Sequence, residues 1–520
     1  MTLLNILTPW IGILIPIYLT LYYLIPYLTT YRPLARYPGP FSAKFSNIWL
    51  GLSARRGQKF AAVDWAHRKY GTIVRVGYNH VSIADERALD TVYAHGNGFL
   101  KDHFYEAFIV GTTGLFNTCD RVDHTRKRKM VAHAFSPKSI GEFEPHMTRN
   151  VERWVGQLDR ICSSAPPQAA YAVMNAMPWF SYLAFDIIGD LAFGAPFGMV
   201  TKGKDETEVQ LVAGGPVSYA PAVEVLNRRG EISSTLGLLP ALRPWAKYLP
   251  DPFFRQGMAA VQNLNGIAVA AVASRIDAAE KGTSMDLDRN DLLARLLQGK
   301  DAHGQKMGRK EVTAEALTQL IAGSDTISNT ACAVFYWILH GERAKPGTVI
   351  PRLQEELDAA IPSGTDVATY ASVKHLPFLK RCIDEGMRLH STSAIGLPRI
   401  VTSPTGISFD EAHFPYGTVL SVPSYTIHHL AEIWGSDVEE FNPMRWDRLN
   451  ERQKKAFNPF SYGPRACVGQ NVAIMELQII IGTAFRRYEF ELVQRKLESH
   501  EGFSKKPQEC WVGIRRRIEV

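Results

Sequence analysis

A short loop near the end of the chain carries the residues with the most specific chemistry. Phe460, Gly463, Arg465, Cys467 and Gly469 follow one another with the spacing F-x-x-G-x-R-x-C-x-G. Glycines let a backbone turn tightly and approach a flat macrocycle, and an arginine can neutralise a carboxylate on that macrocycle. A helix that starts directly after Gly469 would point its positive end near the sulfur and favour the thiolate. The spacing therefore predicts a thiolate metal ligand at Cys467.

This loop resembles the haem-binding loop of cytochromes P-450, and other motifs of that family follow in the right order. The resemblance implies haem b (iron protoporphyrin IX) as the cofactor, with Cys467 as the axial thiolate ligand of the iron. It implies cofactor-binding roles for Phe460, Gly463, Arg465 and Gly469. It also implies the family's fold, which is mainly α-helical with small β-sheets.

Two further motifs of the family have a structural role. Glu385-Gly386-Met387-Arg388 resembles its E-x-x-R motif, in which side chains three residues apart share one helix face and can pair. Arg445, within residues 441–446, resembles the arginine of the F-x-P-x-R-F/W segment. The resemblance implies a three-way pairing of Glu385, Arg388 and Arg445 that holds the proximal side of the haem.

A long apolar stretch predicts a helix over residues 314–339. Within it, residues 322–326 resemble the family's A-G-x-D/E-T motif, which implies that Asp325 and Thr326 are catalytic residues that relay protons during oxygen activation. The resemblance also implies that Gly323 and its small neighbour open a groove for dioxygen. Ile327 stands where the family often has a second Thr or Ser, and we expect it to narrow the oxygen pocket or move a water.

Basic residues predict the binding of the haem carboxylates. His124 and Arg128 are four residues apart, so they share one helix face, and they resemble the family's propionate-binding W/H-x-x-x-R motif. Arg399 matches a further propionate-binding arginine. The other cations of residues 124–129 are expected to project outward and attract an acidic reductase.

The substrate is predicted from a closer resemblance. Residues 95–101, 182–198, 222–231 and 389–394 are similar to fungal benzoate 4-monooxygenases, which implies para-hydroxylation of benzoate to 4-hydroxybenzoate. A buried carboxylate must be paired, and our hypothesis is that Ser391, Thr392 or Ser393 donates hydrogen bonds to it. The alternative role for these hydroxyls is to cap the turn that follows the helix.

The start of the chain predicts a membrane anchor. Residues 1–31 carry no charged side chain, and the apolar run from residue 3 to residue 28 is long enough to cross a bilayer as one helix. Arg32 and Arg36 follow at once, which places the rest of the chain in the cytoplasm. We therefore expect a single-pass anchor in the endoplasmic reticulum membrane over residues 1–31 and a Pro/Gly hinge over residues 32–40.

The remaining residues, 41–520, are expected to form one large catalytic domain. Helical periodicity dominates, strand-like alternation is confined to short stretches such as residues 73–83 and 419–422, and no repeat is evident. The net charge of +7 suits lipid or an acidic protein partner. Nucleic acid is not expected as a partner, because the chain has no zinc spacing, aromatic recognition motif or long basic arm. Six scattered cysteines without a C-x-x-C pair favour a reducing compartment.

The family resemblance implies a monooxygenase that uses O₂ and takes electrons from NADPH–cytochrome reductase, since no flavin or nicotinamide fingerprint is evident. Three alternatives remain open at this stage. The enzyme could hydroxylate another small aromatic or a secondary-metabolite intermediate with the same haem chemistry. It could instead be an isomerase or dehydratase, against which Asp325 and Thr326 argue. A haem-thiolate gas sensor or carrier would need neither the anchor nor a reductase-facing basic surface.

Overall fold

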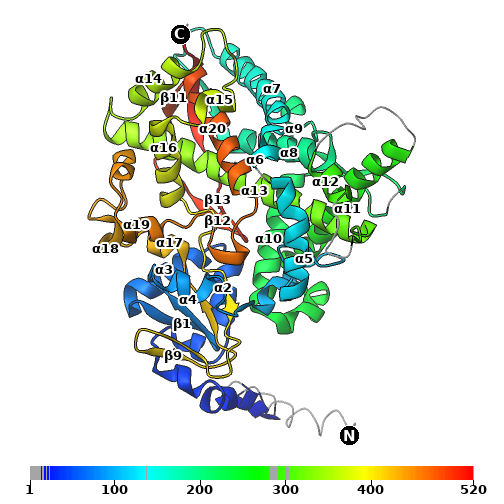
Figure 1. Cartoon of the computed structure of the whole chain (residues 1–520), viewed down its shortest axis with the longest axis vertical. Helices are drawn as coiled ribbons and strands as arrows, with labels where there is room; N and C mark the ends of the chain where they lie inside the picture. Colours follow the sequence, from blue (N-terminus) through cyan, green and yellow to red (C-terminus); the bar gives the residue numbers. More distant parts are fainter. Residues whose placement is uncertain are drawn as a thin grey trace, which may run out of the picture.

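The computed structural model describes residues 13–14, 17–18, 20–22, 24–135, 137–212, 214–280, 291–298 and 304–518. Helices make up most of this part of the chain, and the strands are short, which confirms the prediction of a mainly helical fold with small sheets. In Figure 1 the helices fill the upper part and the right side of the view, and the sheet that contains β1 lies at the lower end.

The helices are α2 (Ile48–Arg55), α3 (Lys59–Tyr70), α4 (Ala88–Tyr93), α5 (Arg121–Ala132), α6 (Pro137–Gly141), α7 (Glu144–Ser163), α8 (Ala176–Phe193), α9 (Met199–Lys202), α10 (Ala222–Leu238), α11 (Pro252–Glu280), α12 (Leu292–Gln298), α13 (Arg309–Ala344), α14 (Ile350–Ala360), α15 (Tyr370–Val373), α16 (Pro377–Leu389), α17 (Ser424–His428), α18 (Ala431–Trp434), α19 (Glu451–Ala456) and α20 (Gln470–Arg487). Short 3₁₀ helices include η1 (Arg32–Arg36), η3 (His103–Phe108), η6 (Pro443–Asp447) and η7 (Gly463–Arg465).

The largest sheet has five strands in the order β1-β2-β10-β7-β3. Its strands are β1 (Ile73–Gly77), β2 (His80–Ile83), β10 (Val419–Ser421), β7 (Arg399–Ile400) and β3 (Leu100–Lys101). A three-stranded sheet joins β11 (Tyr488–Leu492), β14 (Trp511–Arg516) and β4 (Ala172–Asn175). Within the described residues there are also three two-stranded pairs: β5 (Thr207–Val209) with β6 (Ser218–Ala220), β8 (Ile407–Phe409) with β9 (Ala412–Phe414), and β12 (Ser499–Glu501) with β13 (Lys505–Pro507).

Helix α13 runs through the centre of the body and contacts α8, α11, α16 and α20 (Figure 1). Most of its side chains are buried from Val312 to Gly341. Gly323 is what lets α8 approach, because a Cβ at this position would lie 2.6 Å from the side chain of Ile188. The long helix therefore provides a fixed central element, with the other helices packed around it.

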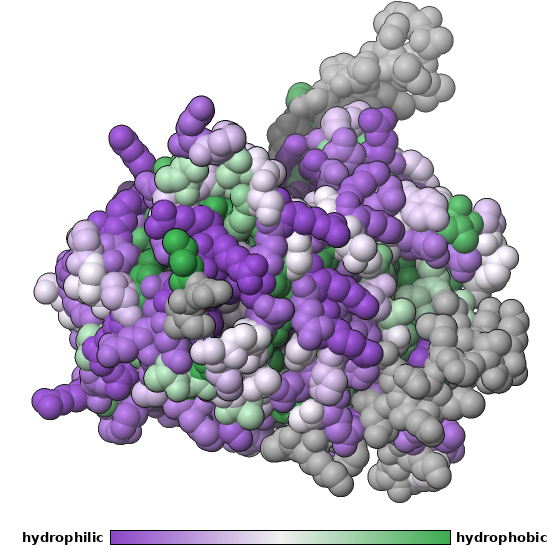
Figure 2. All heavy atoms as spheres, turned by 90° about the horizontal axis from the view of Figure 1, so that it is seen from above, coloured by the Kyte–Doolittle hydropathy of each residue, from purple (hydrophilic) through white to green (hydrophobic). Residues whose placement is uncertain are grey.

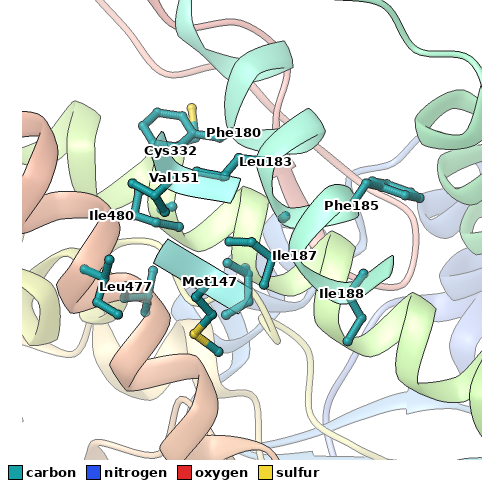
Figure 3. Close-up of a cluster of buried hydrophobic side chains, with 14 of the residues drawn as sticks. Met147, Val151, Phe180, Leu183, Phe185, Ile187, Ile188, Cys332, Leu477 and Ile480 are labelled. Atoms are coloured by element: carbon teal, nitrogen blue, oxygen red, sulfur yellow. The ribbon is translucent and has the colours of Figure 1, made fainter. Parts of the chain in front are cut away.

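The main hydrophobic core joins α7, α8, α13 and α20. Met147 and Val151 from α7, Leu183 from α8, Cys332 from α13 and Leu477 from α20 all lie in it, and Figure 3 shows this cluster. Burying a side chain of this size contributes roughly 1.5–3 kcal/mol, so the core fixes how α13 and α20 lie relative to each other. The face drawn in Figure 2 is mostly hydrophilic, and hydrophobic residues show mainly in its recesses.

The connection at residues 32–40 packs on the body. Leu34 is fully buried in the hydrophobic cluster beside the five-stranded sheet, and Arg36 and Tyr37 each donate a hydrogen bond of 2.8 Å to the carbonyl oxygen of His413. The predicted anchor, residues 1–31, lies partly outside the described residues. In the part of the chain that the structure describes, no helix is both long enough and apolar enough to cross a membrane.

Candidate haem-thiolate site

The loop that carries Cys467 is held by its own backbone and by α5. The amide of Cys467 donates to the carbonyl oxygen of Phe460 over 2.9 Å, and Arg128 donates to the carbonyl oxygen of Ala466 over 2.7 Å. Gly463 has a φ of +71°, and a Cβ there would lie 1.8 Å from the carbonyl oxygen of Tyr93. This position therefore requires glycine, and its close approach fixes the loop against the end of α4.

Cys467 lies just before the first turn of α20, as the sequence predicted. Gly469 is the N-cap of this helix, so the positive end of the helix dipole lies near the sulfur. The side chain is exposed, but the dense protein around it raises the pKa of its thiol. The backbone N–H of Gly469 and the charge of Arg128 act in the opposite direction and lower that pKa. Burial has the larger effect and the pKa of the thiol is raised overall, so the thiolate depends on a bound metal ion, which deprotonates a coordinating thiol.

Five basic side chains gather beside this loop: Lys101, His124, Arg128, Arg399 and Arg465. Burial and the charges of the four other basic residues together lower the pKa of His124 to about 3. Burial and the charge of Arg399 also lower the pKa of Arg465, to about 10. So many cations in one place indicate a binding site for an anion.

The strand register of the largest sheet places two of these cations directly opposite each other. Lys101 on β3 pairs with Arg399 on β7, and the two residues are only 6% and 3% exposed. Like charges directly opposite one another destabilise a sheet. In addition, Arg399 Nη2 is buried without a hydrogen-bond partner among the described residues. The two propionate carboxylates of a haem would supply the missing negative charge, so these residues fit that group.

Lys101 was not predicted as a site residue. It has no motif of its own, and the only available signal was its place at the end of residues 95–101. Its charge lies over the rings of Tyr105 and Phe116, 4.1 and 4.3 Å from their centroids. Burial lowers the pKa of Lys101 well below the usual value, and Arg399 and Arg465 lower it further. The residue therefore belongs to the same cation cluster as the predicted arginines.

The expected outward-facing basic surface on α5 is wrong for two of its residues. Arg126 and Lys127 turn toward the start of α13, where both pair with Asp123 and Glu311. Lys127 is 2% exposed and also donates to the carbonyl oxygen of Thr113 over 2.5 Å. The acidic groups nearby account for the difference, because a cation with two carboxylates in reach gains more from pairing than from hydration. Of residues 124–129, Lys129 is the basic residue that stays exposed.

Glu385, Arg388 and Arg445 lie together as the motifs implied. Arg388 donates to both carboxylate oxygens of Glu385 over 2.8 and 2.9 Å, and Arg445 Nε lies 3.3 Å from Glu385 Oε1. The side chains of Glu385 and Arg388 are fully buried. Trp446 donates a further hydrogen bond of 3.0 Å to the carboxylate. The network ties α16 to η6, the 3₁₀ helix that carries Arg445 and Trp446.

One face of α13 is open at the predicted oxygen-activation motif. Ala322 and Thr326 are exposed in the middle of an otherwise buried helix, and the hydroxyl of Thr326 donates to the carbonyl oxygen of Ala322 over 2.7 Å. Asp325 is half-buried and accepts a hydrogen bond of 3.1 Å from Asn329. The loop at residues 113–118 connects this helix to the cysteine loop, because Leu115 N donates to Glu315 of α13 and Thr118 O accepts from Arg465.

Two expectations about this motif need correction. Gly323 contacts Ile188 of α8, so its small size serves helix packing, whereas Ala322 is the small residue on the open face. Ile327 is 4% exposed and belongs to the main hydrophobic core. It therefore adds packing and does not narrow the open side. A hydroxyl near this motif comes from Thr330, whose side chain donates to the carbonyl oxygen of Thr326 over 2.7 Å.

The three hydroxyls proposed to bind a substrate carboxylate have different surroundings. Ser391 is 1% exposed and its Oγ lies 2.5 Å from Nδ1 of His428, so it is not free to bind a substrate. Thr392 pairs with Thr330 of α13, with 2.8 Å between the hydroxyl oxygens. Ser393 is half-buried. The original hypothesis is thus wrong for Ser391, whose hydroxyl already fixes the turn after α16.

A buried acid at the start of α13 predicts a pH-dependent stability. Burial raises the pKa of Glu315 to about 7 from an ordinary 4.5; the amide of Leu115 and the charge of Lys127 oppose the shift, and Glu311 and Asp123 add to it. The folded pKa is above the unfolded one, so this group's stabilisation is present below pH 4.5 and is lost as the pH rises toward 7. Glu315→Gln removes this loss.

We therefore expect Glu315→Gln to be more stable than the parent near pH 8, by about 2 kcal/mol, and to show a flatter dependence of stability on pH. Denaturant unfolding of both proteins near pH 5 and near pH 8 measures the difference. Parallel curves for the two proteins across this range would contradict the prediction.

Comparison with known proteins agrees with this geometry. The chain matches the cytochrome P450 family over residues 38–511. It is 55% identical to a benzoate 4-monooxygenase from Aspergillus niger over 506 residues, which is 96% of each chain. It is 28% identical to a cytochrome P450 monooxygenase from Penicillium roqueforti, over 93% of this chain and 88% of the relative. It is 29% identical to another from Botryotinia fuckeliana, over 90% and 83%. With a cysteine loop, a cation cluster and an E-x-x-R network arranged as described, the chain belongs to the cytochrome P450 family.

Proposed function

We propose that this chain is a haem-thiolate monooxygenase that inserts one atom of O₂ into benzoate and gives 4-hydroxybenzoate. The observation that carries the proposal is the 55% identity, over 96% of both chains, to a benzoate 4-monooxygenase. Relatives that are only 27–29% identical are monooxygenases of the same family without that substrate in their names. The match to the benzoate 4-monooxygenase covers nearly the whole of both chains and so is not confined to the cysteine loop.

The cofactor of the proposed reaction is haem b. Cys467 would be its axial ligand, and Arg399, Arg465, His124 and Lys101 would hold its carboxylates. When bound, a haem with an axial thiolate supplies the oxygen-activating chemistry, because the sulfur pushes electron density toward the iron and favours O–O cleavage. The overall reaction is R–H + O₂ + 2e⁻ + 2H⁺ → R–OH + H₂O. The protein supplies orientation, a proton path and exclusion of water.

The proton path of the proposed reaction involves Asp325 and Thr326. Thr326 lies on the open face of α13 and donates to Ala322 O, and Asp325 is the adjacent acid, held by Asn329 over 3.1 Å. A carboxylate next to an exposed hydroxyl can take a proton from solvent and pass it to the hydroxyl, which presents it to the reacting oxygen. In this proposal Asp325 passes protons from solvent to the hydroxyl of Thr326 on the open face of the helix.

Replacing this acid is expected to slow turnover while leaving the fold intact. Asp325→Asn keeps the size of the side chain and removes its charge, so we expect a loss of about 100-fold in the rate of hydroxylation. Product formation and oxygen uptake measured together report the change. The control is Ser324→Ala, whose hydroxyl is buried and donates to Leu320 O over 2.6 Å. Equal rates in Asp325→Asn and Ser324→Ala would contradict a proton-relay role for Asp325.

The function itself is tested by offering purified protein, with haem and NADPH–cytochrome reductase, a panel of aromatic compounds. Benzoate, hydroxybenzoates, cresols and cinnamate differ in the position and the presence of the carboxylate. Formation of 4-hydroxybenzoate as the main product supports the proposal. Turnover of the phenols or cinnamate with none of benzoate would overturn the substrate, and NADPH-dependent oxygen uptake absent with every compound would overturn monooxygenation.

The proposal also names the electron donor and the membrane at which the protein acts. We take the donor to be NADPH–cytochrome reductase, and the place of action to be the cytoplasmic side of the endoplasmic reticulum membrane. The uncharged run of residues 1–31, followed by Arg32 and Arg36, supports this placement. Cell fractionation of the full chain beside a chain that lacks residues 1–31 is the test: recovery of the full chain in the soluble fraction would overturn the anchor.

A further inference from the structure

A buried arginine of α10 forms no direct ion pair with a carboxylate among the described residues. Arg229 is 5% exposed, and its Nη2 donates to the carbonyl oxygen of Phe108 over 2.7 Å. Its Nε is buried and makes no hydrogen bond within the part of the chain that the structure describes. No carboxylate among the described residues forms an ion pair with it within 4.0 Å. A buried cation in this condition pays a desolvation cost that an anion would offset.

Other charges face Arg229 from two neighbouring elements. The negative charge of Asp325 on α13 acts to raise the pKa of Arg229, and the same charge acts to raise the pKa of Lys506 on β13. Lys506 in turn lies 3.2 Å from Asn227 of α10. Asp205 and Glu231 also act on Lys506, so Lys506 has further carboxylates near it, whereas Asp325 is the carboxylate that acts on Arg229 within the described part of the chain. The region adjoins the motif of α13 that carries Thr326.

The surroundings of the guanidinium are aromatic. Its Cζ lies 5.0 Å from the centroid of the Phe108 ring. The Phe108, Phe116 and Phe503 rings contact one another edge to face, with centroids 5.2–5.9 Å apart. Phe503 is brought in by the turn between β12 and β13, which passes so close to α10 that a Cβ at Gly230 would lie 3.3 Å from Phe503 N. A cation beside several aromatic rings fits a ligand that has one flat ring and one carboxylate.

We propose that Arg229 binds the carboxylate of the aromatic acid substrate; this inference rests on the proposed function and names the residue that recognises its substrate. Arg229 combines a positive charge, burial and a donor without a partner among the described residues, and it lies beside an aromatic wall, whereas Arg399 shares the first three properties but lies in the cation cluster beside the cysteine loop. In benzoate the para carbon is the ring carbon opposite the carboxylate. An anchor at the carboxylate therefore turns the para carbon away from α10, and the position of Arg229 selects para over ortho attack.

The test compares benzoate with benzamide, which has nearly the same shape and no charge. In Arg229→Gln, benzoate should bind roughly 100-fold more weakly, because truncating one partner of a buried charge pair leaves the other charge unpaired. Benzamide should bind nearly as it does to the parent protein. Calorimetry and the substrate-induced change in the haem spectrum both report binding without requiring turnover. Arg229→Lys keeps the charge but loses the planar fork, so it should retain part of the affinity for benzoate and keeps the test valid if Arg229→Gln folds poorly.

The matched control is the neighbouring arginine. Arg228 lies on the outer side of α10, 41% exposed, near Glu224 and Glu231 at 3.8 and 3.9 Å. Arg228→Gln loses the same charge and should bind both ligands as the parent does. Unchanged benzoate binding in Arg229→Gln would overturn the inference. An equal loss of benzoate and benzamide would also overturn it, since that result assigns Arg229 to holding Phe108. Failure of the parent protein to bind benzoate would instead refute the proposed function.

Discussion

Replacing Cys467 with serine is expected to abolish monooxygenase turnover and to remove the thiolate signature from the carbon monoxide spectrum of the reduced protein. A cysteine thiol that coordinates a metal ion is deprotonated, whereas a serine hydroxyl is a far weaker acid, so the axial push of an anionic sulfur is lost. The loop should keep its shape, because Cys467 N to Phe460 O and Arg128 to Ala466 O are bonds that do not involve the sulfur.

The control for this change is Cys162→Ser. Cys162 lies in α7, far along the chain from the cysteine loop, and its thiol has a pKa that burial raises to about 11. It should give the parent spectrum and the parent rate. A Cys467→Ser protein that still hydroxylates substrate would remove the basis of the assigned chemistry.

Replacing Glu385 with alanine is expected to produce the largest loss of stability. It leaves the fully buried side chain of Arg388 without its carboxylate. It also removes the acceptor that Arg445 and Trp446 share. Breaking a buried pair from one side costs about 3–5 kcal/mol. Denaturant unfolding gives the change in free energy, and the ratio of haem to protein after purification shows whether the proximal side is still held.

A surface acid gives the contrast for Glu385. Glu451 is 89% exposed and pairs with Lys454, and exposed pairs of this kind contribute little. Glu451→Ala should therefore unfold at the same denaturant concentration as the parent. If Glu385→Ala did so as well, the buried network could not be what joins α16 to η6.

The sequence predicted the elements whose apolar residues recur with a clear period and missed those in which this period is weak or absent. The helix predicted over residues 314–339 is the middle of α13, whose true start at Arg309 is polar and carries no apolar period. The hairpin β12–β13 was missed because its strands are short and polar.

Motif spacing identified the cysteine loop, the Glu385 network and several cations, since each of these has partners a fixed number of residues away. Lys101 and Arg229 have no such spacing. Lys101 becomes a site residue through the pairing of β3 with β7, and Arg229 through the contact of α10 with η3. Pairings between segments far apart in sequence are set by the whole fold, and one sequence does not encode them as a local pattern. The same reason explains why Lys127 was expected at the surface.

The docking of residues 32–40 on the body has a mechanical consequence. Leu34 is buried, Tyr37 stacks on Phe414 with ring centroids 5.2 Å apart, and a Cβ at Gly39 would collide with the carbonyl oxygen of Arg75. Because three positions of this segment are packed against the body, the segment cannot rotate freely relative to it. The chain before residue 32 therefore leaves the body in a fixed direction. The angle between that part of the chain and the catalytic body is set by contacts on the surface of the body.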